Sequence, residues 1–227
     1  MKKQLFSVCA ITLVGVVLTL NSCKKEDTTA PVVTIAGGST AISPLNATFT
    51  NPAATAKDEE DGDIATVTVT GTVDKNQTGD YTLTYTATDA AGNAGTATLV
   101  VTVRNDAYEW EGDYDATETD ANGPYTYSES VEVYASETVN NRLVFDRFAD
   151  FDNSDGVYMN ITGTNIDVPL QTATDIGSGT ATCDIASHTF IGTGAKNSTG
   201  FTLTYTDTKI APCSGTRTGV VATFVMQ

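Results

Sequence analysis

The sequence predicts an all-β protein made of two successive bodies, a β-sandwich followed by a small antiparallel meander barrel. Beyond residue 29 the chain is dominated by Thr, Val, Gly and Tyr in short runs that alternate apolar and polar residues, the pattern of half-buried strands. No apolar repeat of 3.6 residues continues for three turns, which argues against helices. Clusters of Asn, Asp and Gly separate the runs and predict tight turns.

Residues 1–22 read as a secretory signal peptide, since Lys2 and Lys3 precede an apolar stretch too short for a mature spanning helix. The four residues that follow this stretch, Leu20 to Cys23, resemble the lipobox of bacterial lipoproteins. The resemblance implies that Cys23 becomes the first mature residue and carries lipid, each buried methylene of which contributes about 0.8 kcal/mol to membrane attachment. The alternative is a cysteine that happens to lie near an ordinary cleavage site.

Residues 23–29 form a predicted tether. Within it, Lys25, Glu26 and Asp27 resemble the short export signal of Bacteroidetes-type surface lipoproteins. That resemblance implies a lipid-anchored protein of the outer membrane that faces the cell exterior, whereas the alternative is a solvated, charged linker. Asp27 with the two threonines after it also resembles the O-glycosylation acceptor of the same lineage.

Residues 30–104 form the first body. Its predicted strands share alternating Thr, Val and Tyr residues and cover 31–37, 64–73, 80–89 and 95–103. The opening APVVTIAGG, the acidic KDEEDGDI and the closing TGDYTLTYTATDAAGNAGTATLVVTV resemble a bacterial immunoglobulin-like domain. This resemblance implies a spacer or adhesive module without catalytic chemistry, and it places Tyr81 where a tyrosine corner would lie.

Residues 105–227 form the second body, with nine predicted strands. They are bounded by turn residues and cover 108–114, 125–135, 141–148, 156–163, 165–172, 179–185, 187–194, 201–207 and 218–226. A meander of this many strands best removes its exposed edges by closing into a barrel. The body resembles the lipocalin-like barrels of the same lipoprotein class, including a WxGxY start at Trp110, Gly112 and Tyr114.

Four cysteines support an exported protein. Cys9 would leave with the signal peptide and Cys23 would be acylated, which leaves Cys183 and Cys213 as a predicted disulfide. Closing a loop of about thirty residues would stabilise the fold by about 3–4 kcal/mol in the chain-entropy model. The alternative is a pair of buried free thiols.

The chain is strongly acidic, with 12 basic and 28 acidic residues. Loss of residues 1–22 removes two lysines and no acid, which changes the net charge from −16 to −18. Such a surface repels phosphate backbones, so nucleic acid is not an expected partner. Contact with a membrane is expected through the lipid anchor alone.

Acidic residues crowd the loop from Asp58 to Asp63, and Asp89 lies in a second loop, TDAAGN, that a sandwich can bring nearby. The favoured interpretation is a solvated acidic turn. The alternative is a calcium site formed by Asp58, Asp61, Asp63 and Asp89, because calcium prefers hard oxygen ligands. The spacing does not fit an EF-hand loop. No other cofactor is expected.

No enzymatic motif is visible. His188 is the single histidine, and GxSxG, HExxH and CxxC are all absent. We therefore interpret His188 as structural and the protein as non-enzymatic, with a hydrolase as the less favoured reading.

Tyr125 and Tyr127 follow the turn at Asn122 and Gly123, and they either stack on a ligand such as a sugar ring or cap the core. The leading hypothesis is a surface lipoprotein that binds an extracellular glycan or protein. The alternative is a structural accessory subunit of an outer-membrane complex. Whether the barrel interior is hollow or filled decides where a ligand could bind.

Overall fold

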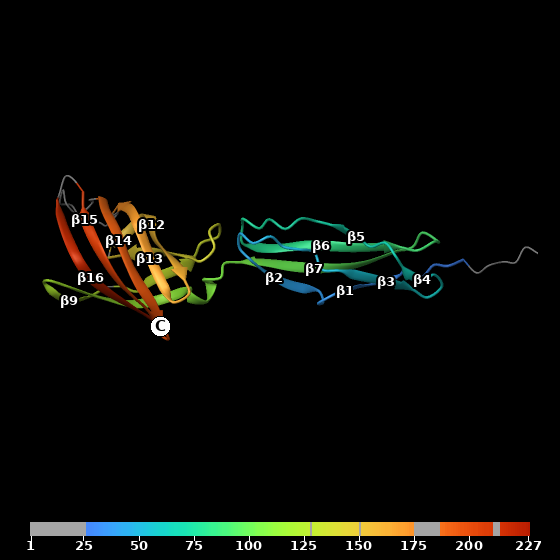
Figure 1. The fold of residues 1–227 in the computed structure, drawn as a ribbon, viewed down its shortest axis with the longest axis horizontal. Coiled ribbons are helices and arrows are strands. Elements are labelled where there is room, and N and C mark those ends of the chain that lie inside the picture. Colours follow the sequence, from blue (N-terminus) through green and yellow to red (C-terminus); the bar gives the residue numbers. More distant parts are fainter. Residues whose placement is uncertain (1–25, 128, 150, 175–186, 211–213) are drawn as a thin grey trace, which may run out of the picture.

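The computed structural model describes residues 26–127, 129–149, 151–174, 187–210 and 214–227. It confirms the predicted fold class, an immunoglobulin-like β-sandwich followed by a closed antiparallel β-barrel. Figure 1 shows the two modules lying end to end, with the first described residues at the end of the sandwich farthest from the barrel. Among the described residues no helix reaches the length and apolar character needed to cross a bilayer.

The sandwich consists of two sheets. The first contains three short strands, β1 (Val32–Ile35), β3 (Ala54–Asp58) and β4 (Gly62–Ile64). The second contains four strands in the order β2 (Thr40–Pro44), β7 (Ala94–Arg104), β6 (Gly79–Thr88) and β5 (Thr68–Thr70). The long β6–β7 hairpin is antiparallel throughout, whereas β2 runs parallel to β7.

The alternation predicted for residues 80–89 is confirmed. Leu83, Tyr85 and Ala87 are buried, and Leu83 and Tyr85 belong to the core cluster with residues of β1 and β7. Tyr81 donates a hydrogen bond from its hydroxyl to the carbonyl oxygen of Gln77, 2.9 Å away. This is the backbone contact expected of a tyrosine corner, so that prediction is also confirmed.

Two parts of the sandwich differ from the sequence prediction. The predicted strand over 64–73 is divided into β4 and β5, which belong to different sheets. Strands β2 and β3 were not predicted. Strand β2 ends at Pro44, which is unusual in a strand, and β3, with the sequence ATAKD, has a single β-branched residue and no aromatic one. Tertiary packing overrides these local preferences.

The barrel contains eight strands and an additional hairpin strand. The barrel strands are β8 (Gly112–Asp120), β10 (Val131–Ala135), β11 (Arg142–Phe148), β12 (Phe151–Thr162), β13 (Asn165–Thr174), β14 (Ser187–Asn197), β15 (Gly200–Lys209) and β16 (Gly215–Met226). Neighbours along the chain pair in order, and β8 closes the barrel by pairing with both β16 and β10. The extra strand, β9 (Gly123–Thr126), continues the β8 edge beyond β10.

Aromatic rings fill the described interior of the barrel. Five phenylalanines are at most 1% exposed: Phe145, Phe148, Phe190, Phe201 and Phe224. Their neighbouring ring centroids lie 4.8 to 6.5 Å apart, the spacing of packed aromatic pairs. A ligand held inside the barrel, as the lipocalin-like resemblance implies, would have to displace this core. Any ligand of the described part of the barrel would therefore have to bind at its ends, its loops or its outer face.

The entry to the barrel differs from the prediction. The expected strand over 108–114 begins only at Gly112, because Tyr108–Trp110 form a 3-10 helix. Asn105 favours this turn by accepting a hydrogen bond from the Ala107 amide, 2.9 Å away. The expected strand over 125–135 is interrupted between β9 and β10. The expected strand over 179–185 lies outside the described residues.

Asn105 also connects the two modules. Its side chain is buried, and its amide nitrogen donates to the carbonyl oxygens of Ser136 and Val139 at 2.8 and 3.0 Å. Asn46, from the sandwich, exchanges hydrogen bonds with the same β10–β11 loop at Thr138 and Asn140. The junction is thus held by specific polar contacts on both sides.

Candidate functional site

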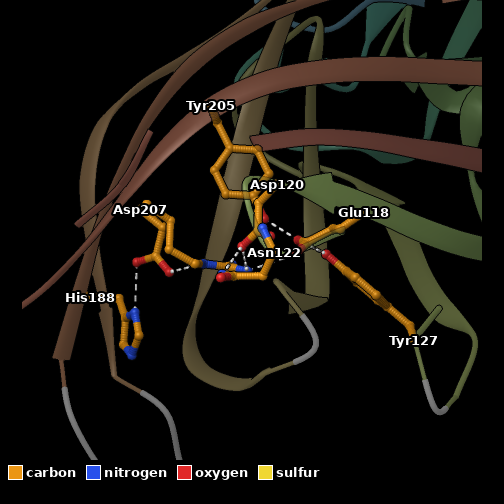
Figure 2. Close-up of polar contacts among 8 residues, drawn as sticks. Glu118, Asp120, Asn122, Tyr127, His188, Tyr205 and Asp207 are labelled. Carbon is orange, nitrogen blue, oxygen red and sulfur yellow. Dashed lines mark hydrogen bonds and ion pairs between the residues drawn. The ribbon is translucent and has the colours of Figure 1, made fainter. Parts of the chain in front are cut away.

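Three buried ionisable side chains lie together inside the barrel (Figure 2), and one of them, Glu118, pairs with Tyr125 of β9. Figure 1 shows β9 at the end of the barrel away from the sandwich. Glu118 of β8, His188 of β14 and Asp207 of β15 are only 3 to 4% exposed. Their positions follow from strand alternation, since Glu118 comes two residues after buried Ala116 and Asp207 comes two residues after buried Tyr205. The apolar core therefore ends in a layer of charge.

Arg217 of β16 partly neutralises this layer. Its guanidinium lies 3.2 Å from the Glu118 carboxylate, 3.3 Å from that of Asp207 and 3.6 Å from that of Asp120. Burial lowers the pKa of Arg217, but the adjoining carboxylates, Glu118 first, outweigh burial and raise it above its usual range. One guanidinium nitrogen, Nη2, is buried without a hydrogen-bond partner.

Two tyrosines hold Glu118 from its other side. Tyr127 donates a hydrogen bond to Glu118 Oε1 at 2.5 Å, and Tyr205 donates to the same oxygen. Burial raises the pKa of both hydroxyls, and the Glu118 charge raises it further. Both tyrosines therefore remain protonated donors around neutral pH, and the Glu118 carboxylate is fixed in place (Figure 2).

His188 completes the cluster. Its Nδ1 lies 2.7 Å from Asp207 Oδ1, and its ring stacks on Phe190 with an interplanar angle of 9°. A histidine that is only 3% exposed and held by a carboxylate and an aromatic ring fits the structural interpretation made from the sequence. Its contribution to the site is to orient Asp207 toward Arg217.

A groove of about 310 Å³ opens beside this cluster. Its walls come from β8, the turn at Asn122, β9 and β16, and consist of Glu118, Asp120, Asn122, Gly123, Pro124, Tyr125 and Arg217. The Asn122 amide donates to Asp120 Oδ1 at 2.7 Å, which sets the turn, and Gly123 supports it with a φ of +117°. The Asn122 amide, together with the positive charge of Arg217, keeps the pKa of Asp120 below its usual value.

Tyr125 gives the groove an aromatic wall. Half of this residue is exposed, and its ring centroid lies 6.3 Å from that of buried Tyr127. A flat apolar ring beside a carboxylate, a carboxamide and a guanidinium combines stacking area with hydrogen-bond donors and acceptors. This combination suits a ligand with both apolar faces and many hydroxyl groups.

The structure separates the two tyrosines predicted as ligand-binding residues. Tyr125 lines the groove, whereas Tyr127 is 6% exposed and packs edge-on against Phe224. For Tyr127 the structure agrees with the core-capping interpretation. Asp120 and Arg217, which line the groove, were missed because their contact depends on strand pairing across the barrel closure. The one local signal was an acidic residue, Glu118, at a position where the alternation of β8 requires a buried side chain.

The acidic residues expected at a calcium site lie at the opposite end of the molecule. Asp61 and Asp89 come together there, and Asp27 joins them, with one carboxylate oxygen from each residue within 4.8 Å of the others. Asp58 is buried at the end of β3 and Asp63 is exposed on β4, and neither belongs to the three-residue group. The sequence therefore identified two members of this group and missed Asp27.

A second, larger groove of about 610 Å³ lies at the junction of the modules. It is lined by Thr78 and Arg104 from the sandwich and by residues of the barrel entry, including the exposed Tyr108 and Tyr134. One face of Tyr108 is covered by the Arg104 guanidinium, 3.9 Å from the ring centroid. Cys23, Cys183 and Cys213 lie outside the described residues, so the predicted acylation and disulfide stay predictions.

Comparison with known proteins supports the immunoglobulin-like assignment of the first module. Residues 33–103 match the family model of the bacterial surface protein Ig-like domain. This stretch is the sandwich described above, so the chain carries an immunoglobulin-like module of a type found in bacterial surface proteins. A comparison with curated protein sequences finds no match.

Two solved structures resemble the whole chain weakly. One is a lipoprotein from Bacteroides thetaiotaomicron, with 19% identity and a TM-score of 0.32 over 85% of this chain and 100% of that one. The other is a structure from Clostridium perfringens ZmpB. It contains a carbohydrate-binding module, CBM51-2, in complex with GlcNAc, together with INT domains. It has 13% identity and a TM-score of 0.28 over 86% of this chain and 43% of that one. Scores this low carry no functional information for the present chain.

Proposed function

We propose that the protein is a non-enzymatic surface lipoprotein that binds an extracellular glycan at the groove beside Tyr125. The observation that carries this proposal is the half-exposed Tyr125 ring beside Asp120, Asn122 and Arg217. A sugar ring offers an apolar face for stacking and hydroxyl groups on its rim. The groove provides a partner for each of these features.

The charge layer behind the groove supports the proposal. Glu118 and Asp207 hold Arg217 through contacts of 3.2 and 3.3 Å, so the guanidinium is fixed before a ligand arrives. A binding group that is already ordered loses little conformational entropy on binding. The three nearby carboxylates outnumber the single guanidinium, which favours a neutral or weakly cationic glycan over an anionic one.

A lipid anchor at Cys23 would add to binding by this groove. A protein held at the cell surface meets surface-bound partners at a raised effective concentration, so a weak site suffices. Metabolic labelling with a clickable fatty acid tests the anchor: the chain should be labelled, and the Cys23→Ser variant should not. An equally labelled serine variant would remove acylation at this residue from the proposal.

A glycan array followed by calorimetric titration tests the binding site. Tyr125→Ala should weaken binding at least about fivefold, taking for a sugar ring the roughly 1–3 kcal/mol that aromatic stacking on nucleic-acid bases is worth by alanine substitution. Tyr134→Ala is the matched control, because Tyr134 is similarly exposed but lines the junction groove. Loss of binding in Tyr134→Ala alone would assign the ligand to the junction, and no glycan binding by the wild-type chain would favour the accessory-subunit alternative.

A further inference from the structure

We propose that the end of the sandwich farthest from the barrel binds one calcium ion through Asp27, Asp61 and Asp89, beside the buried carboxylate of Asp58. This inference is independent of glycan binding, because the two sites lie at opposite ends of the molecule (Figure 1). It revises the residue set expected from the sequence, in which Asp63 stood in the place of Asp27.

The three carboxylates come from separate segments of the chain. Asp27 precedes β1, Asp61 lies in the turn between β3 and β4, and Asp89 follows β6. One oxygen from each lies within 4.8 Å of the others. Calcium binds oxygen at about 2.3–2.6 Å, so two ligands of one ion are separated by at most about 5 Å. The observed spacing therefore matches a shared calcium ion.

Asp58 provides an independent indication of a missing partner. It is 3% exposed, and its Oδ1 accepts the amides of Glu60 and Asp61 at 2.8 and 3.0 Å. Its second oxygen, Oδ2, is buried and has no hydrogen-bond partner. A buried carboxylate oxygen with no donor is costly, and a bound cation removes that cost.

Strand alternation explains why Asp58 and Asp89 are both buried. Asp58 ends β3 two residues after buried Ala56, and Asp89 directly follows β6, two residues after buried Ala87. A hydrogen bond of 2.7 Å from the Ala90 amide to Asp61 Oδ2 joins the two loops at this end of the sandwich. Asp89 and Asp58 are thus both next to Asp61, Asp89 within the three-residue group and Asp58 through its hydrogen bond with the Asp61 amide.

No protein cation forms a direct ion pair with these carboxylates within the described residues. None of the ion pairs there involves Asp27, Asp58, Asp61 or Asp89. The adjacent Lys57 is exposed on the outer face of β3, opposite the inward Asp58. Asn93 orders Asp89 instead, with its amide and side-chain nitrogens 2.7 and 2.8 Å from the Asp89 carboxylate.

Calcium at this position would fasten the N-terminal segment to the sandwich. The backbone carbonyl of Asp27 already accepts a hydrogen bond from the Asn93 side chain at 3.1 Å. A shared ion would add a second attachment for the same residue. Because Asp27 lies four residues after Cys23, this attachment would set how the sandwich leaves a lipid anchor.

The test uses the full chain, purified in detergent and freed of metal with a chelator. Calorimetric titration should show one calcium per chain with a dissociation constant on the order of 0.1–1 mM, the range of extracellular modules. Thermal melting at 10 mM calcium should be raised by several degrees. Absence of both heat and a melting shift at that concentration would overturn the proposal.

Neutral variants identify the ligands. Asp27→Asn and Asp61→Asn should each weaken calcium binding at least tenfold. Asp27→Asn keeps the backbone carbonyl that Asn93 contacts, so the fold is preserved. Asp63→Asn is the matched control from the same acidic loop, and it should change the dissociation constant less than twofold. Equal losses in the Asp61 and Asp63 variants would indicate diffuse attraction of calcium by the acidic loop and would refute the site.

Discussion

Replacing Arg217 with methionine should destabilise the barrel, because it removes the cation that holds Glu118 and Asp207 together. Both acids are buried, at 3 and 4% exposure, and would lose contacts of 3.2 and 3.3 Å. Breaking a buried ion pair costs about 3–5 kcal/mol. Since the Arg217 side chain is 35% exposed, solvent screens part of this interaction, and we expect about 2–3 kcal/mol.

Urea unfolding followed by Trp110 fluorescence measures this loss. Trp110 is the single tryptophan and packs against the barrel core, so its emission reports the barrel rather than the sandwich. Glu118→Gln, made alone and together with Arg217→Met, completes a double-mutant cycle. The glutamine keeps an oxygen for Tyr127 and Tyr205 but lacks the charge. Loss of Arg217 should then cost about 1–2 kcal/mol less than in the wild type. Strictly additive losses would refute the ion-pair reasoning.

Three further predictions follow from buried groups. Phe148→Ala should cost about 3–5 kcal/mol in urea unfolding, because Phe148 is fully buried among four other rings; a loss below 1 kcal/mol would mean that the barrel core is loosely packed. Asn105→Ala should cost about 2–3 kcal/mol by calorimetry and loosen the module junction in hydrogen exchange, since it leaves the carbonyls of Ser136 and Val139 without a donor. Burial raises the pKa of Tyr114 to about 12 and also raises that of Tyr127 and Tyr205. The stabilisation that comes from these raised pKa values is complete below a pH of about 10, the pKa of tyrosine in the unfolded chain. It is lost as the pH rises from there through the higher pKa values of the folded protein. The melting temperature should therefore fall steeply above pH 10, with tyrosinate absorbance appearing together with unfolding; early titration of all nine tyrosines in folded protein would contradict this.

The fold was largely predictable because its signals are local. Alternation over residues 80–89 places Leu83, Tyr85 and Ala87 inside the sandwich, and the structure agrees. Clusters of turn residues indicated the boundaries of most barrel strands, because these clusters are also local signals. Local patterns failed where packing outweighs propensity, as in β3, whose sequence ATAKD has little strand preference but pairs with β1 on one side and β4 on the other.

The groove was less predictable because strand pairing across the barrel closure creates it. Glu118 and Arg217 are 99 residues apart, and they meet only because β8 pairs with β16. Tyr125 was predicted as a ligand-binding residue because the turn that precedes it is a local signal. Asp27 escaped notice at the acidic end of the sandwich for the reason that hid Arg217: no spacing in the sequence links the segment before β1 to the turn after β3.

The length of the β6–β7 hairpin has a consequence for where the barrel can act. Strand β7 has 11 residues, and at about 3.3 Å per residue it extends roughly 35 Å. The polar contacts of Asn105 fix the barrel to the C-terminal end of strand β7. On a lipidated chain this length would let the barrel reach several nanometres from the bilayer, toward partners that project from the cell envelope.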